Sequence, residues 1–511
     1  MRTKEAFKNL ITSLLLEVAV ALSGILIPRF FAALYGSTVN GLVSSIGQFI
    51  TYMGLVEAGI SAAGTVALYG PLAQKDTNKI SELVSTARSF YFRSGWIFVG
   101  LVAALVAIYP FIVRNEIADA GFVRMMILIL SVNGIVDYFF LGKYRVLLTA
   151  DQKVYVIYSV QIVGIVVMTV ASLLLIHLEC SALLVKAVVA IVYVLRSLAV
   201  AVYVKKAYPD VNFRAKPNMR LFNQRWAALL HQVVGMIVNN TSLVLLTVML
   251  KTNALVEVSI YSVYNLVANA IRTLLTSLGN SLNSSFGQVI ANQETDVLKK
   301  SFSTYEYLFF MLTFFFHVCM TVLLYPFIVL YVSDFSDGHL YPQWVLVALF
   351  SLVGLVQTLR IPSMTVYLAA GHFKETRTRA ILEAAINLTV SIALVRPLGI
   401  VGVLLGTLAS YLYRTVDVFF YSAKRFLPGT LGKTFGRILR NGAASAFLVW
   451  LGIRFIPSAM DGWFVWFAYA VAAAAVSAIV LATVNFVFEK KEFLVAFARV
   501  KALKNRKATA Q

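Results

Sequence analysis

The sequence predicts an all-α polytopic membrane protein with about fourteen transmembrane helices, arranged as two six-helix lobes around a central cleft, with two further helices at the C-terminal end. Three observations predict this fold. Long apolar stretches divide the chain, basic residues alternate between the connections, and part of the chain repeats. With 60% hydrophobic residues, the composition is not that of a soluble protein.

The apolar stretches each hold about twenty residues or more, which is enough for a helix to cross about 30 Å of hydrocarbon. In chain order they predict spans at 10–34, 41–68, 95–113, 122–148, 155–176, 183–204, 226–250, 258–290, 302–330, 344–370, 380–395, 400–422, 438–456 and 463–488.

Lys and Arg give the expected orientation, because basic residues near the ends of spans stay in the cytoplasm. With the N-terminus inside, most of the 44 Lys and Arg lie on inner connections. The outer connections hold only Arg114, Arg124, Lys251, Arg396 and Arg454. Both termini are therefore expected to be cytoplasmic.

The net charge of +21 follows from this topology and does not indicate nucleic-acid binding. The basic tail, residues 490–507, is expected to rest on anionic membrane lipid. The first apolar run is too long for the apolar region of a signal peptide, so we expect the first helix to be retained.

No residue pattern indicates an enzyme, a cofactor or a metal site. The sequence has no phosphate-binding glycine loop and no nucleophile elbow. The two cysteines, Cys180 and Cys319, lack a redox spacing, and the five histidines lack metal-ligand spacing. We therefore expect a protein that is not an enzyme and draws no energy from nucleotide.

An internal repeat relates the sixth and twelfth spans. The residues Tyr193-Val-Leu-Arg196-Ser197 recur as Tyr411-Leu-Tyr-Arg414-Thr415, in the same register. Six spans separate the copies, so both have the same orientation, which is typical of a parallel repeat about an axis along the membrane normal. The expected organisation is an N-terminal lobe (1–204), a cytoplasmic linker (205–225), a C-terminal lobe (226–425), two further helices (426–488) and the basic tail (489–511).

Polar residues follow one helical face of the eighth predicted span. They recur every three or four residues, at Asn265, Asn269, Arg272, Thr276, Gly279 and Asn283. The repeat relates this face to a stripe of small or hydroxyl residues in the second span, at Gly47, Thr51, Gly54, Ala58, Ser61 and Thr65. Such faces predict a water-filled cleft, or else tight helix packing through small residues.

The seventh and first spans add candidate cleft residues. The seventh contributes Gln232 and Asn239, and the first contributes Glu17 and, near its outer end, Arg29 beside Pro28. Arg29 could also snorkel to the membrane surface.

Arg272 is the main candidate for ligand binding. It lies deep in its span, where a cation needs a counter-charge or water. An anionic ligand would suit it, since guanidinium gives a phosphate two parallel hydrogen bonds. The alternative is a structural ion pair with Glu57 or another acid. Arg360, beside Pro362, is a second candidate, with a role in either the cleft or helix packing.

Three acids are candidates for coupling transport to a proton or sodium gradient. They are Glu57, Glu17 and Asp417. Each could equally act as an internal counter-ion, and Asp417 lies three residues from Arg414 on one helix, where the two charges can neutralise each other.

Several segments resemble bacterial polysaccharide flippases of the multidrug/oligosaccharidyl-lipid/polysaccharide (MOP) exporter superfamily, the O-antigen and capsule type. The similar segments are Ile27-Pro28-Arg29-Phe30, Gly54-Leu-Val-Glu57-Ala-Gly59, Leu68-Tyr69-Gly70-Pro71, Tyr261-Ser262-Val263-Tyr264, Ala369-Ala370-Gly371-His372-Phe373-Lys374 and Leu398-Gly399-Ile400-Val401-Gly402. One departure concerns the seventh span, where relatives often carry an acid and this chain has Asn239-Asn240-Thr241-Ser242.

The resemblance implies fourteen helices in two lobes around a V-shaped cleft, in the bacterial cytoplasmic (plasma) membrane. It implies alternating access for an oligosaccharide on undecaprenyl pyrophosphate, with a polysaccharide polymerase and glycosyltransferases as partners of a monomer. The alternatives are a peptidoglycan lipid-precursor flippase, a cation-coupled multidrug exporter of the same superfamily, and a membrane glycosyltransferase or polymerase.

Overall fold

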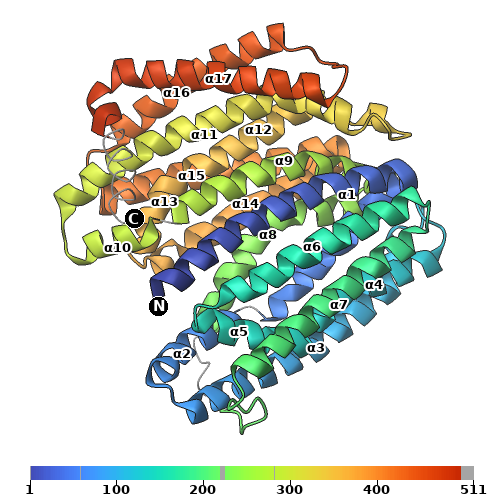
Figure 1. Ribbon diagram of the computed structural model, residues 1–511. Coiled ribbons are helices and arrows are strands. Elements are labelled where there is room, and N and C mark those ends of the chain that lie inside the picture. The colour runs from blue at the N-terminus through green and yellow to red at the C-terminus, as the bar shows by residue number, and fades with distance from the viewer. Residues whose placement is uncertain (1, 58, 219–224, 281, 496–511) are drawn as a thin grey trace. The chain divides into compact units, whose positions relative to one another are not determined.

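The computed structural model describes the chain except for residues 1, 58, 219–224, 281 and 496–511, and all its regular elements in the described part are helices (Figure 1). Contacts divide the chain into two compact units, Met1–Ile260 and Tyr261–Gln511. Most of the predicted basic tail lies outside the described residues. The long apolar helices confirm the prediction of an all-α polytopic membrane protein.

The first unit is a layer of packed helices in which α6 lies between α1 and α7, α7 packs against α4, and α4 packs against α3 (Figure 1). Its helices are α1 (Arg2–Met53), α2 (Ile60–Gln74), α3 (Thr77–Ile112), α4 (Ala120–Val136), α5 (Gly142–Ala150), α6 (Val154–His177), α7 (Ala182–Ala207) and α8 (Arg225–Met249), with the start of α9 (Ala254–Asn280).

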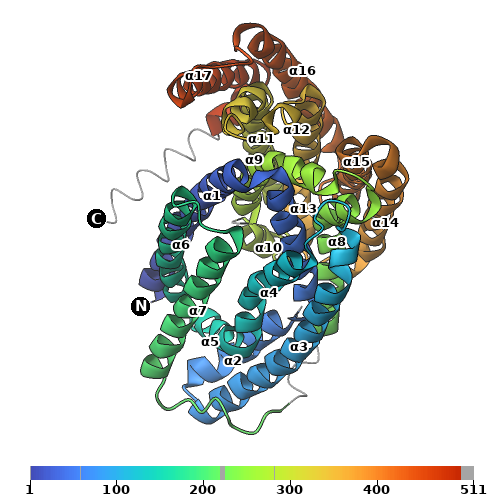
Figure 2. The same ribbon diagram turned by 90° about the vertical axis from the view of Figure 1, so that its right-hand side faces the viewer.

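The second unit contains the rest of α9 and every later helix. In it α14 packs against α15, α15 against α12, and α11 against α12, α16 and α17 (Figure 2). These helices are α10 (Asn283–Ala291), α11 (Thr295–Tyr331), α12 (Trp344–Leu359), α13 (Ile361–Ala369), α14 (Phe373–Leu398), α15 (Ile400–Arg425), α16 (Leu431–Phe455) and α17 (Trp463–Phe488).

Eleven of the described helical stretches are long and apolar enough to cross a membrane. The other predicted spans coincide with the second half of α1, with α8, and with α16, whose basic residues lower its hydropathy. The first predicted span and the first part of the second both lie on α1, which departs from helical geometry at Gly36, where φ is 83°. Gly36 permits this departure because only glycine adopts this backbone conformation without strain.

Two of the predicted spans are interrupted at corresponding places. The fourth consists of α4 and α5, joined by the π-helical turn Asp137–Leu141, and the tenth consists of α12 and α13, which meet at Arg360. Polar groups can interrupt a span only where protein or water satisfies them. Both interruptions bring a charged side chain into the interior of its unit.

Apolar side chains fill each unit separately. In the first unit the buried residues include Phe31, Leu42, Val84 and Tyr109. In the second unit Leu275, Phe310, Phe314 and Leu481 lie together where α9, α11 and α17 approach one another. In water, burial of each large side chain contributes about 1.5–3 kcal/mol to the free energy of folding. In lipid, close packing between helices largely replaces this contribution.

Candidate functional site

The polar stripe of the eighth predicted span lies in part on the accessible face of α9, whereas Gly279 is buried and Asn283 belongs to α10. Asn265 and Asn269 are exposed, and Arg272 and Thr276 are half-buried. The opposite face of the same helix packs into its unit through buried residues, namely Tyr261, Tyr264 and Leu275. The predicted amphipathic character of this helix is therefore present, with its amides accessible.

Arg272 and Asn269 form one polar group on this face. The Nε of Arg272 donates to Oδ1 of Asn269 at 3.1 Å, and Nη2 donates to the same oxygen. Because the residues are one helical turn apart, this contact orients the guanidinium along the helix. It leaves the guanidinium half-buried rather than enclosed in the core of its unit.

The other cleft candidates on α8 and α10 are only partly described. Asn239 is exposed on α8, where its Nδ2 donates to the carbonyl of Gly235 at 2.7 Å. The side chains of Gln232 and Asn283 lie outside the described residues. Whether these residues share one cleft with Arg272 stays a prediction.

The candidates on α1 lie apart from each other along the helix. Glu17 is exposed, whereas Arg29 is half-buried, with its guanidinium 5.7 Å from the ring centre of Phe30. The contact with Phe30 is a cation–π interaction.

The stripe predicted on the second span does not follow one continuous helix, and this part of the prediction is wrong. The α1 helix ends at Met53, a 3₁₀ turn covers Gly54–Glu57, and α2 begins only at Ile60. Gly59 before α2 has a φ of 83°, which ends regular helix geometry. The small residues that suggested a helical face also supply the backbone freedom for this break.

A buried polar contact joins the second half of α1 to the start of α9. Nδ2 of Asn40 donates to Oγ of Ser259 at 2.7 Å. One residue further on, a Cβ added at Gly41 would lie 1.7 Å from the carbonyl oxygen of Leu255. Only glycine permits the two backbones to approach this closely. We call this contact the α1–α9 corner, formed by Asn40, Gly41, Leu255 and Ser259.

Two further interactions support the corner. The carboxylate of Glu116 accepts hydrogen bonds from the backbone N–H groups of Ala254 and Leu255, at 2.6 and 2.8 Å, and so caps the N-terminus of α9. The hydroxyl groups of Ser45 on α1 and Thr247 on α8 are 2.7 Å apart. The orientation expected from the sequence puts this corner at the outer side of the membrane.

An ion-pair network occupies the interior of the second unit. Nη1 of Arg360 lies 2.5 Å from Glu383, and Arg414 lies 3.5 Å from Glu383 and 2.7 Å from Asp417. Arg379 also pairs with Asp417. These acids and Arg360 therefore act within the protein as mutual counter-ions, and the expected pairing of Arg414 with Asp417 is confirmed.

The first unit holds a corresponding network beside a cavity of about 450 Å³. Arg145 lies 2.9 Å from Asp137 and 3.9 Å from Glu57, and the hydroxyl of Tyr193 donates to Asp137 at 2.6 Å. Arg196 lies 3.8 Å from the ring centre of Tyr193. Glu57 thus has a cationic neighbour, Arg145, in its own unit.

The sequence reasoning gave no role to Arg145, Arg437 or Glu306. Arg437 on α16 is almost fully buried and bonds to Glu306 on α11, at 2.9 Å. Acidic residues in the middle of apolar helices could have indicated these ion pairs, since a charged group within a span needs a partner. The identity of each partner depends on helix packing, which the sequence does not give. No group of three or more metal-binding side chains is found in the part of the chain that the structure describes.

The architecture is similar to that of several solved membrane transporter structures. No protein-family model and no curated protein matches the chain. Among solved structures, the lipid II flippase MurJ, in an inward closed conformation, has a TM-score of 0.62 at 14% identity, over 93% of this chain and 99% of that one. An inward-facing MATE-family multidrug resistance transporter of the MOP superfamily has a TM-score of 0.60 at 12% identity, over 81% and 96%.

The chain has the fold of these MOP-superfamily proteins. A eukaryotic MATE transporter is also similar, with a TM-score of 0.55 at 14% identity, over 86% of this chain and 99% of that one. The comparison confirms the superfamily fold that the sequence motifs suggested. The three similar proteins are two transporters and a flippase.

Proposed function

We propose that the protein is a flippase that moves an undecaprenyl-pyrophosphate-linked oligosaccharide from the cytoplasmic to the outer leaflet of the bacterial plasma membrane, by alternating access, for surface polysaccharide export. The observation that carries the proposal is the exposed polar face of α9, with Arg272 half-buried among amides, in a fold that MurJ shares.

The chemistry of this face suits a lipid-linked glycan. Such a molecule combines a diphosphate, a sugar rich in hydroxyl groups and a long apolar tail. Arg272 would hold the diphosphate through two parallel hydrogen bonds. Asn265, Asn269 and Asn239 would exchange hydrogen bonds with sugar hydroxyls, since an amide both donates and accepts.

The α1–α9 corner would form the outer closure in this mechanism. Asn40 and Ser259 are buried in the contact, and the fit at Gly41 has little tolerance. Closed interfaces of this kind are bistable, because close-packed surfaces either meet or separate. Separation of the corner would release the glycan outward. Glu17, Glu57 and Asp417 remain the proposed acids for a proton or sodium coupling, and a polymerase and glycosyltransferases remain the proposed partners of a monomer.

A peptidoglycan lipid precursor is the second candidate substrate. It is favoured by the similarity to the lipid II flippase MurJ, which extends over 93% of this chain, compared with 81% for the MATE-family multidrug resistance transporter. The two substrates share the polyprenyl diphosphate, so Arg272 would serve both. A multidrug exporter fits less well, because the α9 face is cationic and would repel cationic drugs.

The test replaces Arg272 in cells that depend on this protein for delivery of lipid-linked glycan. Arg272→Ala should lower the delivery rate about 10- to 100-fold, the loss expected for a charge-assisted hydrogen bond to phosphate. Arg272→Lys should restore part of it, since the charge remains and the two-pronged geometry is lost. Arg396→Ala, which removes an exposed charge elsewhere in the second unit, serves as the matched control.

Protein abundance in the membrane is measured in parallel. Normal delivery by Arg272→Ala at normal abundance would remove the phosphate-binding role and leave Arg272 as a packing residue. Delivery assayed separately with capsule-type and peptidoglycan-type precursors decides between the two substrates.

A further inference from the structure

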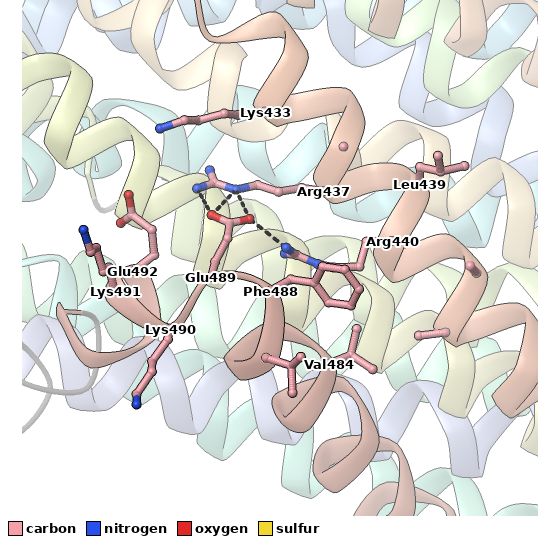
Figure 3. Close-up of a pocket in the computed structure, with 14 residues that line it drawn as sticks. Lys433, Arg437, Leu439, Arg440, Val484, Phe488, Glu489, Lys490, Lys491 and Glu492 are labelled. Atoms are coloured by element: carbon pink, nitrogen blue, oxygen red, sulfur yellow. Dashed lines mark hydrogen bonds and ion pairs between the residues drawn. The ribbon is translucent and has the colours of Figure 1, made fainter.

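A cavity of about 970 Å³ opens between α16 and α17 in the second unit, at the end of these helices that the sequence predicts to be cytoplasmic (Figure 3). Its walls come from Gly436 to Ala444 on α16, from Val484 to Phe488 on α17, and from the residues directly after α17. The two helices pack against each other and against α11. The cavity therefore lies within one unit and apart from the α9 face.

The base of the cavity is a fixed polar cluster. Arg437 donates through Nη1 to Glu306 at 2.9 Å, and through Nε to Glu489 at 3.1 Å. Arg440 donates to Glu489 at 2.8 Å. Glu492 accepts a hydrogen bond from Ser303 at 2.9 Å. Each carboxylate near the cavity thus already has a protein donor, and the two arginines neutralise the two nearest acids.

Three lysines at the rim are additional to this neutral cluster. Lys433, Lys490 and Lys491 are exposed, and among the described residues no carboxylate forms an ion pair with any of them. The amino groups of Lys433 and Lys491 lie beside the Arg437–Glu489 pair (Figure 3). The amino group of Lys490 points away from the pair and lies 5.7 Å from the ring centre of Phe486. Together with Arg437 and Arg440, the rim and base hold five cations, against Glu489 and Glu492 in the lining and Glu306 behind it.

Apolar side chains line the other side. Leu439, Val487 and Phe488 are 77%, 68% and 70% exposed. In Figure 3, Leu439 and Val484 lie on the side of the pair opposite to the lysine amino groups. The small residues Gly436 and Ala443 leave space between the helices, and a Cβ added at Gly436 would meet nothing within 4 Å. The cavity is thus cationic at its mouth and apolar along the part that runs into the membrane-spanning region.

We propose that this cavity binds one bilayer phospholipid with an anionic headgroup, its phosphate held by Lys433 and Lys491 and an acyl chain along Leu439, Val484 and Phe488. Charge complementarity and the separation of cationic from apolar lining select this occupant over a zwitterionic lipid or a soluble anion. The bound lipid would pin α16 to α17 at their cytoplasmic end. The cavity shares no lining residue with the polar face of α9.

The test measures phospholipid binding to the purified, delipidated full-length protein by native mass spectrometry, with phosphatidylglycerol and phosphatidylcholine of matched chains. Phosphatidylglycerol should bind about tenfold or more tightly than phosphatidylcholine. The double variant Lys433→Gln/Lys491→Gln should weaken phosphatidylglycerol binding about 30-fold, given the usual contribution of each lysine to anionic-lipid binding. Gly436→Leu should also weaken it, because the added side chain fills the groove.

Two control variants match these changes. Lys205→Gln/Lys206→Gln removes the same charge from exposed positions at the end of α7, and Gly432→Leu adds the same side chain one turn earlier on α16, where a Cβ also meets nothing within 4 Å. Both should bind phosphatidylglycerol as the unmodified protein does.

Four outcomes would overturn the proposal. Equal binding of the two lipids would remove the anionic selectivity, and equal loss in the Lys205→Gln/Lys206→Gln control would show general attraction to the surface. Binding of glycerol phosphate without acyl chains, or displacement of phosphatidylglycerol by an equal amount of undecaprenyl diphosphate, would assign the cavity to a soluble anion or to the transported lipid.

Discussion

Arg360 and Arg272 show how two arginines deep in apolar spans acquire different surroundings. Both were candidates for ligand binding on the same argument, that a cation in a span needs a partner. The structure gives Arg360 a carboxylate at 2.5 Å, in a network buried within its unit, whereas Arg272 bonds to a neutral amide on an accessible face. Arg272 is therefore the better candidate for an anionic ligand, because its guanidinium lies on the accessible face of α9, whereas that of Arg360 is held inside the unit.

This difference predicts that replacing Arg360, unlike replacing Arg272, mainly lowers the stability of the protein. Arg360→Ala would leave Glu383 buried with a weakened counter-charge, and it should lower the free energy of unfolding by about 3–5 kcal/mol. The double variant Arg360→Met/Glu383→Leu should recover most of that loss, because it removes both charges. Unfolding in denaturant, monitored by fluorescence in detergent, measures both. A stable Arg360→Ala protein that has lost transport would instead indicate a ligand-binding role.

At the scale of elements, the start of α9 belongs to the first unit because of two local features. Gly41 permits close approach of α1, and Glu116 caps the helix. The sequence places the lobe boundary at 205–225, while the contacts divide the chain inside α9. A pattern of apolar residues predicts a helix, but it does not predict which segment the end of that helix contacts. Here the contact depends on Gly41 and Glu116, which are distant in sequence from the start of α9.

Gly41→Ala should open the α1–α9 corner, since the new methyl group would overlap a backbone carbonyl that cannot move aside by itself. In a background without Cys180 and Cys319, a cysteine at the buried Ser45 should then react several-fold faster with an impermeant maleimide. Gly47→Ala on the same helix is the control, because its Cβ would meet nothing within 4 Å. Unchanged labelling in Gly41→Ala would mean that the corner accommodates the methyl group without opening.

The α16–α17 contact should depend on pH through Glu489. Burial raises the pKa of Glu489, but hydrogen bonds and charges from Arg437 and Arg440 outweigh it, so that the pKa lies below its usual value of 4.5. A carboxyl group whose pKa is lower in the folded than in the unfolded protein stabilises the fold. This stabilisation is complete above the pKa of the unfolded state and is lost as pH falls through the pKa of the folded state.

The stability difference between the unmodified protein and Glu489→Gln should therefore stay constant from neutral pH down to about pH 5 and shrink only at lower pH. Thermal unfolding of both proteins across this range is the measurement. A difference that already shrinks between pH 7 and pH 6 would be inconsistent with a lowered pKa.

At the scale of the whole molecule, hydropathy and motif resemblance were enough to predict an all-α membrane protein with a MOP-superfamily fold. The length of each apolar stretch sets the helix, since the bilayer leaves no alternative for the backbone. The interruptions at Asp137, Arg360 and Gly54–Glu57 were not predicted, because they depend on partners such as Arg145 and Glu383 that packing brings together. The stripe from Asn265 to Thr276 was predictable because this part of it lies within the single helix α9, whereas Asn283 belongs to α10.

Alternating access requires the corner to open during transport. A cysteine pair at Asn40 and Ser259, whose side chains are hydrogen-bonded in the structure, should crosslink on oxidation in the protein without Cys180 and Cys319. The crosslink should stop glycan delivery, and reduction should restore it. Unimpaired delivery with the crosslink formed would mean that the corner does not separate during transport.

The central claim is that this chain alone moves a lipid-linked glycan across the bilayer. The most direct measurement reconstitutes the purified protein into vesicles with a fluorescent undecaprenyl-pyrophosphate oligosaccharide and follows its exposure to an added membrane-impermeant glycosidase. The account predicts rapid exposure of the inner-leaflet pool with the unmodified protein and a rate at least about tenfold lower with Arg272→Ala. Equal rates for the unmodified protein, Arg272→Ala and protein-free vesicles would contradict it.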